Sequence, residues 1–80
     1  MIKVCIYYVD QLPGGEVGII EFLSQKGYHE RDSIIYDKNS VVRGRLKDGT
    51  HFSEETLELH VFGDPNLEKI IDKHIADNLS

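Results

Sequence analysis

The densest group of side chains that could do chemistry is a short basic series: Arg43, Arg45, Lys47 and, a few residues later, His51. Side chains two residues apart in a strand project from the same face of a sheet, so this spacing predicts a positive stripe. The stripe could bind a partner protein or a phosphate backbone. In the alternative interpretation, Glu58 and His60 on a neighbouring antiparallel strand lie opposite these cations and help to set the register.

A second candidate site is the glycine-rich loop that contains Gly14, Gly15 and Gly18. Backbone N–H groups that are exposed between a strand and a helix can cradle a phosphate. The loop lacks the spacing of the common dinucleotide and nucleotide motifs, and Glu16 adds a negative charge beside it. A small-ligand site or an enzyme centre at this loop is therefore the alternative hypothesis, and a plain connecting loop is the simpler interpretation.

The distribution of charge separates the two halves of the chain. The net charge is −5, and the acidic excess lies entirely in residues 49–80. A negative field repels phosphate backbones and attracts basic surfaces. We therefore expect a protein partner, with Glu54, Glu55 and Glu58 contributing to its binding. Nucleic-acid binding through Arg43, Arg45 and Lys47 is disfavoured and is kept as a second alternative.

No combination of residues predicts a reacting centre. Cys5 lies in the most apolar segment, where burial raises the pKa of a thiol and makes it inert. The four histidines lack the spacing of metal-binding motifs. We expect no catalytic residue, no metal site and no cofactor, and the sequence favours a non-enzymatic role.

The composition is typical of a folded protein. The chain has 80 residues, 40% of them apolar and 29% charged, which predicts a single compact domain over residues 1–80. It contains no apolar run of the ~20 residues that a membrane-spanning helix needs, so no membrane association is expected. A lone cysteine fits a reducing compartment, and we expect a cytoplasmic location.

The first half of the chain predicts a strand, a turn and a helix. Residues 3–9 are apolar on both alternating faces, which favours a central strand that is covered on both sides. The turn residues of 10–15 follow. Apolar positions beginning at Val17 predict a helix that faces the sheet and ends at Gly27. A strand is the competing interpretation of this segment, because Gly18 weakens a helix.

Three more strands are expected in the second half, at residues 33–37, 41–47 and 56–62. Turn-forming residues at 37–40 predict a hairpin between the first two. Asp48 and Gly49 form a pair that is favoured in tight turns, which predicts the next reversal there. The strict alternation of residues 56–62 indicates a half-buried strand, with a helix as the alternative.

The last predicted element is an amphipathic helix over residues 65–79. Asp64 is a suitable N-cap and Pro65 a suitable first helical residue. The helix has an apolar stripe formed by Leu67, Ile70, Ile71, Ile75 and Leu79. The predicted fold is thus α+β: a small single-layer, mostly antiparallel sheet with two helices packed on one face, in the order β-α-β-β-β-α.

These observations favour a small interaction or regulatory protein. We expect it to bind a macromolecular partner, a protein above all, through a face or an edge of the sheet and through its acidic C-terminal half. A sheet of this size has at least one open edge, and edge pairing is a common route to a symmetric dimer. A homodimer is therefore a further expectation.

Overall fold

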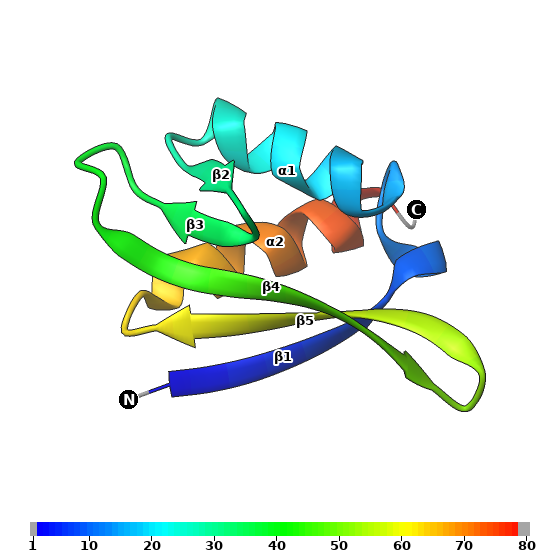
Figure 1. Cartoon of the computed structure of the whole chain (residues 1–80). Coiled ribbons are helices and arrows are strands. Elements are labelled where there is room, and N and C mark those ends of the chain that lie inside the picture. Colours follow the sequence, from blue (N-terminus) through cyan, green and yellow to red (C-terminus); the bar gives the residue numbers. More distant parts are fainter. Residues whose placement is uncertain (1, 79–80) are drawn as a thin grey trace.

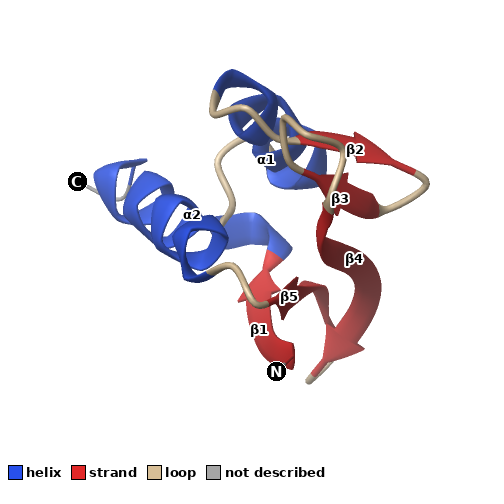
Figure 2. Ribbon diagram, turned by 90° about the vertical axis from the view of Figure 1, so that its left-hand side faces the viewer, coloured by secondary structure: helices blue, strands red, loops and turns tan. Residues whose placement is uncertain are grey.

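The computed structural model describes residues 2–78. These residues form the strands β1 (Ile2–Tyr8), β2 (His29–Arg31), β3 (Ile34–Tyr36), β4 (Val42–His51) and β5 (Glu54–Phe62), the helices α1 (Gly15–Gln25) and α2 (Pro65–Asn78), and the short 3-10 helix η1 (Val9–Gln11). The strands make one antiparallel sheet in the order β1-β5-β4-β3-β2 (Figure 1). Both helices pack on the same face of it (Figure 2), so the predicted α+β fold is confirmed. The order of elements has one strand more than predicted, the short β2.

Helix α1 forms where the apolar pattern predicts it. Ile19 and Leu23 are buried against the sheet, and the chain leaves the helix through Gly27, whose φ of 92° favours glycine. Val17, which was expected to face the sheet, is instead 67% exposed. It is wrong as a core residue because a helix has 3.6 residues per turn, which puts Val17 about 200° around α1 from the buried Ile19 and so on the solvent side.

Helix α2 begins as the sequence predicts. The backbone N–H of Asn66 donates to a side-chain oxygen of Asp64 over 3.1 Å, which is the hydrogen bond of an N-cap. Leu67 and Ile71 are fully buried, and Ile70 and Ile75 pack against the core from its margin. Leu79, the last apolar position of the predicted helix, lies outside the described residues.

The reversal between β4 and β5 was placed wrongly. Asp48 and Gly49 lie inside β4, and the turn is made by Phe52 and Ser53, with φ values of 51° and 67°. The core explains the shift. The observed register puts Leu46 directly opposite Leu59 in the buried layer. A two-residue turn at Asp48 and Gly49 would instead pair Leu46 with His51, which is exposed.

The position of β1 was also predicted wrongly. It is an edge strand, paired with β5 alone among the described strands, and is not a central strand covered on both sides. The helices cover only one face of the sheet (Figure 2). The prediction failed because apolar residues on both faces of a strand normally indicate burial on both faces, and here one of these faces is exposed.

The core lies between the sheet and the two helices. It is formed by the buried side chains of Leu12, Ile19, Leu23, Tyr28, Ile35, Leu46, Leu57, Leu59, Val61, Leu67 and Ile71. Neither of the described helices is long and apolar enough to span a membrane. The core therefore lies on one side of the sheet, and the second face of the sheet stays outside it.

Candidate functional site

The face of the sheet turned away from the helices is called the outer face below. Residues directly opposite each other on antiparallel strands share a face, so the register identifies its members. It carries Ile2, Val4 and Ile6 of β1, Glu58 and His60 of β5, and Arg45 and Lys47 of β4. No described segment covers this face (Figure 2).

Three aliphatic side chains form a row along β1 on the outer face, the apolar row. Ile2 is 63% exposed, Val4 49% and Ile6 61%. Single exposed aliphatic residues are ordinary, but three successive outward positions of one strand make a continuous apolar strip. Each of these side chains costs hydration free energy that burial against a partner would recover.

The backbone of the same three residues points to the open edge of β1. The N–H of Leu46 donates to the carbonyl of Ser33 over 2.7 Å, on the side of β4 away from β5. Because the groups of successive residues point alternately to the two sides of a strand, those of Arg45 and Lys47 point toward β5. The alternation carries through the register to Leu59, which points toward β1, and to its partner Cys5. The outward positions are therefore Ile2, Val4, Ile6 and Tyr8.

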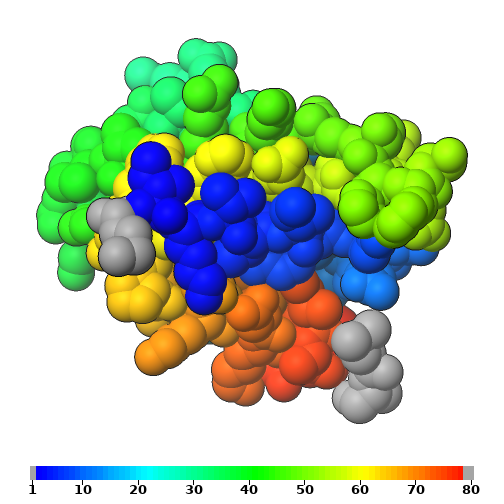
Figure 3. Space-filling view, turned by 90° about the horizontal axis from the view of Figure 1, so that it is seen from below, coloured from blue at the N-terminus to red at the C-terminus, as the bar shows by residue number. Residues whose placement is uncertain are grey.

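The two edges of the sheet differ. Edge strand β1 has seven residues, whereas the opposite edge, β2, has only three, and these include Glu30 and Arg31. Short, charged edge strands resist pairing with other chains, whereas a longer edge with an apolar face invites it. In the space-filling view toward the β1 edge, the described residues of β1 run uncovered between β5 and α2 (Figure 3).

The helix side of β1 is fixed by polar contacts with α2. Lys3 forms a 2.8 Å ion pair with Glu68, and the hydroxyl of Tyr7 donates to Asp72 over 3.0 Å. Burial, followed by the Asp72 carboxylate, raises the pKa of Tyr7, so its hydroxyl stays protonated. Cys5 lies between them at the margin of the core, and burial raises the pKa of its thiol. The Cys5 side chain is half-buried and not a fully buried core residue, but the pKa of its thiol is raised, as the sequence predicts.

Two members of the predicted basic stripe lie on the outer face. Arg45 is directly opposite His60, and Lys47 is directly opposite Glu58, as the interpretation based on cross-strand pairing required. Nε2 of His60 is 3.4 Å from a carboxylate oxygen of Glu58 and makes no hydrogen bond with the described residues. The centre of the face thus carries two cations, Arg45 and Lys47, and one carboxylate, Glu58, which can help to select whatever binds there.

Arg43, the third predicted cation, serves the turn that precedes β4. Its Nε donates to Asp37 over 2.9 Å, and the same carboxylate accepts the N–H groups of Asn39 and Val41. The Arg43 guanidinium and these donors lower the pKa of Asp37. The register of the β3–β4 pairing shifts between Ile35 and Tyr36, beside this turn. Arg43 thus stands apart from Arg45 and Lys47.

The tip of the β4–β5 hairpin presents an exposed aromatic residue. Phe52 is 84% exposed although its backbone has a positive φ, which is rare for a bulky side chain. The centroid of its ring is 4.3 Å from that of the His51 ring, and the centroid of the His51 ring is 6.2 Å from that of the Tyr8 ring. Tyr8 is the next outward residue of β1 after Ile6, so the aromatic residues extend the apolar row to the tip.

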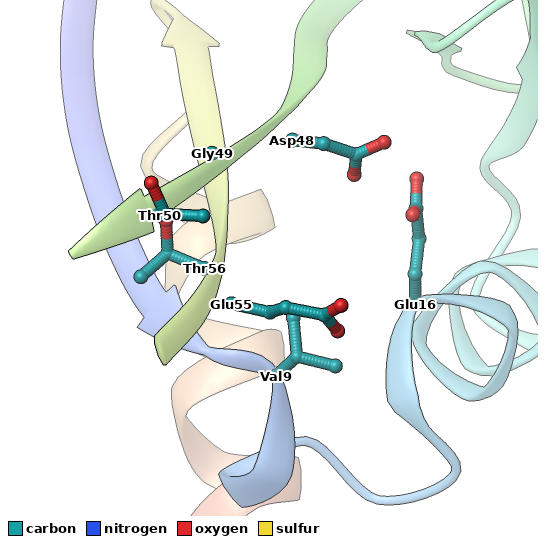
Figure 4. Close-up of a pocket in the computed structure, with 7 residues that line it drawn as sticks. All are labelled: Val9, Glu16, Asp48, Gly49, Thr50, Glu55 and Thr56. Carbon is teal, nitrogen blue, oxygen red and sulfur yellow. The ribbon is translucent and has the colours of Figure 1, made fainter. Parts of the chain in front are cut away.

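The remaining predicted acidic residues, Glu54 and Glu55, lie at the same hairpin. Glu54 is paired with His51, and Glu55 lines a pocket of about 440 Å³ between the hairpin and the start of α1. Glu16 and Asp48 face each other across this pocket (Figure 4). Burial, and then a hydrogen bond and repulsion from Asp48, raises the pKa of Glu16. The pocket therefore has an acidic lining.

The predicted glycine loop has a structural explanation beside this pocket. A Cβ at Gly18 would lie 2.0 Å from the carbonyl oxygen of Pro13, so only glycine fits there. The N–H of Gly15 is already donated to Leu12, and the loop conformation gives Gly14 a φ of 73°. With Glu16 and Asp48 adjacent, the surroundings disfavour an anion. The structure does not bring Gly14, Gly15 and Gly18 together with any of the cations discussed above.

Residues 2–78 contain no group of three His, Cys, Asp or Glu side chains that could hold a metal ion. Sequence reasoning missed Ile2, Val4, Ile6 and Phe52 as surface residues. The available signal was the run of apolar residues on both faces of β1, which was interpreted as burial. No family model, curated protein or solved structure matches this chain. The features that bear on its function are therefore those of its own surfaces.

Proposed function

We propose that this chain is a protein-interaction module that binds another polypeptide through the outer face and the open edge of β1. The observation that carries the proposal is the apolar row: Ile2, Val4 and Ile6 are exposed on a strand whose backbone groups are free at the same positions. An added strand would use both features at once, because main-chain hydrogen bonds and alternate side chains act together in strand addition.

The neighbouring charges support a polypeptide as the ligand. Arg45 and Lys47 on β4 lie opposite His60 and Glu58 on β5, which is the strand next to the apolar row. A surface of mixed sign beside an apolar strip is typical of protein interfaces, in which the apolar part supplies free energy and the charges select the partner. Only two exposed cations remain together on this face, which is a small footprint for a phosphate backbone.

The acidic C-terminal half contributes less than the composition suggests. Asp64 caps α2, Glu68 is paired with Lys3, and Asp72 accepts from Tyr7. These three carboxylates maintain the fold. Glu58 on the outer face and Glu54 at the hairpin remain as acidic groups of the proposed contact surface, and they favour a partner with basic residues beyond its paired strand, whereas Glu55 lines the pocket on the helix side.

The test compares two variants in affinity capture from cells that produce the chain. Ile6→Asp places a charge in the apolar row, and Val17→Asp places the same charge on α1, at a valine that is equally exposed. Quantitative mass spectrometry should find a protein that is retained by the wild type and by Val17→Asp and is lost with Ile6→Asp. Thermal melts of the two variants check that both remain folded.

Equal recovery of every associated protein with both variants would show that the apolar row binds nothing, and the proposed function would then be abandoned. A protein lost with both variants would indicate a general effect of charge. Because Ile6→Asp and Val17→Asp add the same charge at two distant exposed positions, a comparison of the two variants separates a specific loss of binding from a general effect of charge.

A further inference from the structure

We propose that the polypeptide that occupies the open edge of β1 is a second copy of this chain, paired antiparallel with β1 about a two-fold axis at Cys5. The inference rests on the proposed function, because it names the partner of the same edge. Closed two-fold assemblies of identical chains are the commonest oligomers, and they require a surface that is complementary to itself.

Pairing about Cys5 uses the whole strand. It places Val4 opposite Ile6 of the second copy, and Ile2 opposite Tyr8. These four residues are the ones whose backbone groups point outward, as the alternation from the Leu46 hydrogen bond establishes. All seven residues of β1 are then paired, and no outward N–H or C=O within the strand is left without a partner.

The side chains on the outer face match in the same register. The apolar rows of the two copies run side by side, with each aliphatic residue next to an aliphatic or aromatic one. Cross-strand pairs of this kind stabilise a sheet by ~0.2 to 1 kcal/mol each relative to alanine pairs. The product is one sheet with an apolar strip two strands wide at its centre.

The charges on the helix side select this arrangement. Each copy carries Lys3, paired with Glu68, at one end of β1 and Tyr7, bound to Asp72, at the other. Antiparallel pairing about Cys5 brings Lys3 opposite Tyr7 of the second copy, and so toward its Asp72 carboxylate. Parallel pairing in register would bring Lys3 beside Lys3, and an axis at Val4 would bring Lys3 opposite the neutral Cys5.

The arrangement of elements leaves room for the second copy. The buried face of α2 lies over the middle of the sheet, where Leu67 reaches the position of Gly44 in β4. Figure 1 accordingly shows β1 as the lower rim of the sheet, with α2 above it and behind the sheet. Assembly would stop at two copies, because the edge that remains is the short, charged β2.

The first experiment measures the mass of the purified chain by sedimentation equilibrium in reducing buffer across the micromolar range. The expected mass is about 18 kDa, twice the 9.1 kDa of one chain. Val4→Lys with Ile6→Lys should be monomeric, because the introduced charges would face each other across the axis. Val17→Lys with Val41→Lys adds the same charge at two exposed valines away from β1 and should remain dimeric.

The second experiment tests the register with diamide, which takes two electrons and two protons from a pair of thiols. Cys5 and Cys5 of the second copy would form a non-hydrogen-bonded pair with Cα atoms about 4.5 Å apart, within the range of a disulfide. The wild type should become a covalent dimer. Val4→Cys in a Cys5→Ser background should not, since Val4 faces Ile6. A reversed pattern would overturn the axis at Cys5.

A purified chain that is monomeric and forms no covalent dimer would overturn the inference. If Ile6→Asp nevertheless loses a different protein in the capture experiment, the proposed function stands and the occupant of the edge is that protein. If neither effect is seen, both proposals fail. Dimerisation that persists in Val4→Lys with Ile6→Lys would place the interface elsewhere and would also reject the inference.

Discussion

The hydroxyl of Tyr28 donates a 2.7 Å hydrogen bond to Asp64, the residue that caps α2. Tyr28 follows α1 and is 7% exposed, so this contact joins the end of one helix to the start of the other. Asn66 donates to the same hydroxyl over 3.3 Å. Burial, and then the Asp64 carboxylate, raises the pKa of Tyr28. The contact therefore ties the end of α1 to the start of α2 on the face of the sheet that both helices cover.

Tyr28→Phe should keep the buried ring and remove this hydrogen bond. The expected loss of unfolding free energy is ~1 to 2 kcal/mol, the range for a hydrogen bond to a charged acceptor. Urea denaturation measures it. Tyr36→Phe is the matched control, because the Tyr36 hydroxyl makes no hydrogen bond with the described residues and its ring stacks on His29. An equal effect in both variants would contradict the role given to Asp64.

Gly18→Ala should destabilise the protein although alanine is the better helix former. Propensity alone would stabilise α1 by ~1 kcal/mol. The new Cβ would lie 2.0 Å from the Pro13 carbonyl oxygen, and relieving a backbone clash of this kind costs ~1 to 3 kcal/mol or more. The expected net change is a lower midpoint of thermal unfolding. Glu21→Ala, at an exposed position of α1, is the control and should change stability little. A more stable Gly18→Ala variant would refute the close approach.

Replacing the hairpin tip by Phe52→Asn with Ser53→Gly should stabilise the fold by ~1 kcal/mol. Both positions have positive φ, which Asn and Gly adopt readily and Phe does not. Little packing is lost, since Phe52 is 84% exposed. Under the proposed function, the same variant should bind its partner less tightly, because local rules are broken where a side chain serves recognition. A variant with lower stability would show that the ring of Phe52 supports the fold.

Glu16→Gln should make stability less dependent on pH. The pKa of Glu16 is raised above its ordinary value of 4.5, so the folded state favours the protonated form. The corresponding stability is fully present below pH 4.5 and is lost as pH rises through the folded pKa. At pH 7 the variant should be more stable by up to ~0.5 kcal/mol, an amount that fits a partly exposed pair. At pH 4 the difference should nearly disappear.

Thermal melts at both pH values measure this effect, with Glu21→Gln as the control for the loss of one charge from α1. A gain that is equal at pH 4 and pH 7 would show that repulsion from Asp48 is not its cause. A loss at pH 7 would show that the ionised Glu16 has a favourable partner in the folded state.

The elements with strong local signals were the ones predicted best. Asp64 and Pro65 indicated the start of α2, and Gly27 indicated the end of α1, because capping depends on a few adjacent residues. The hairpin between β4 and β5 was misplaced, because the Asp48 and Gly49 turn signal is weaker than the pairing of Leu46 with Leu59. Strand β2 was missed because His29, Glu30 and Arg31 have no apolar alternation of their own.

The candidate site was predicted only in part. The alternation of Arg45 and Lys47 placed them correctly on one face, since the period of a strand is a local property. The apolar row was not recognised, because exposure depends on which strands and helices lie beside β1. In residue type and in spacing along the strand, Ile6 resembles a core residue. It is 61% exposed because β1 is an edge strand and both helices pack on the opposite face of the sheet.

By itself, the sequence determined an α+β chain with two amphipathic helices, antiparallel hairpins and no recognisable reacting centre, because helix caps, turn residues and hydrophobic periods act over a few neighbours. The tertiary structure alone decided that β1 is an edge, that Phe52 is the tip of a hairpin and that Arg43 turns to Asp37. These features arise from contacts between residues far apart in the chain, and the register of the core selects among arrangements that local preferences leave equal.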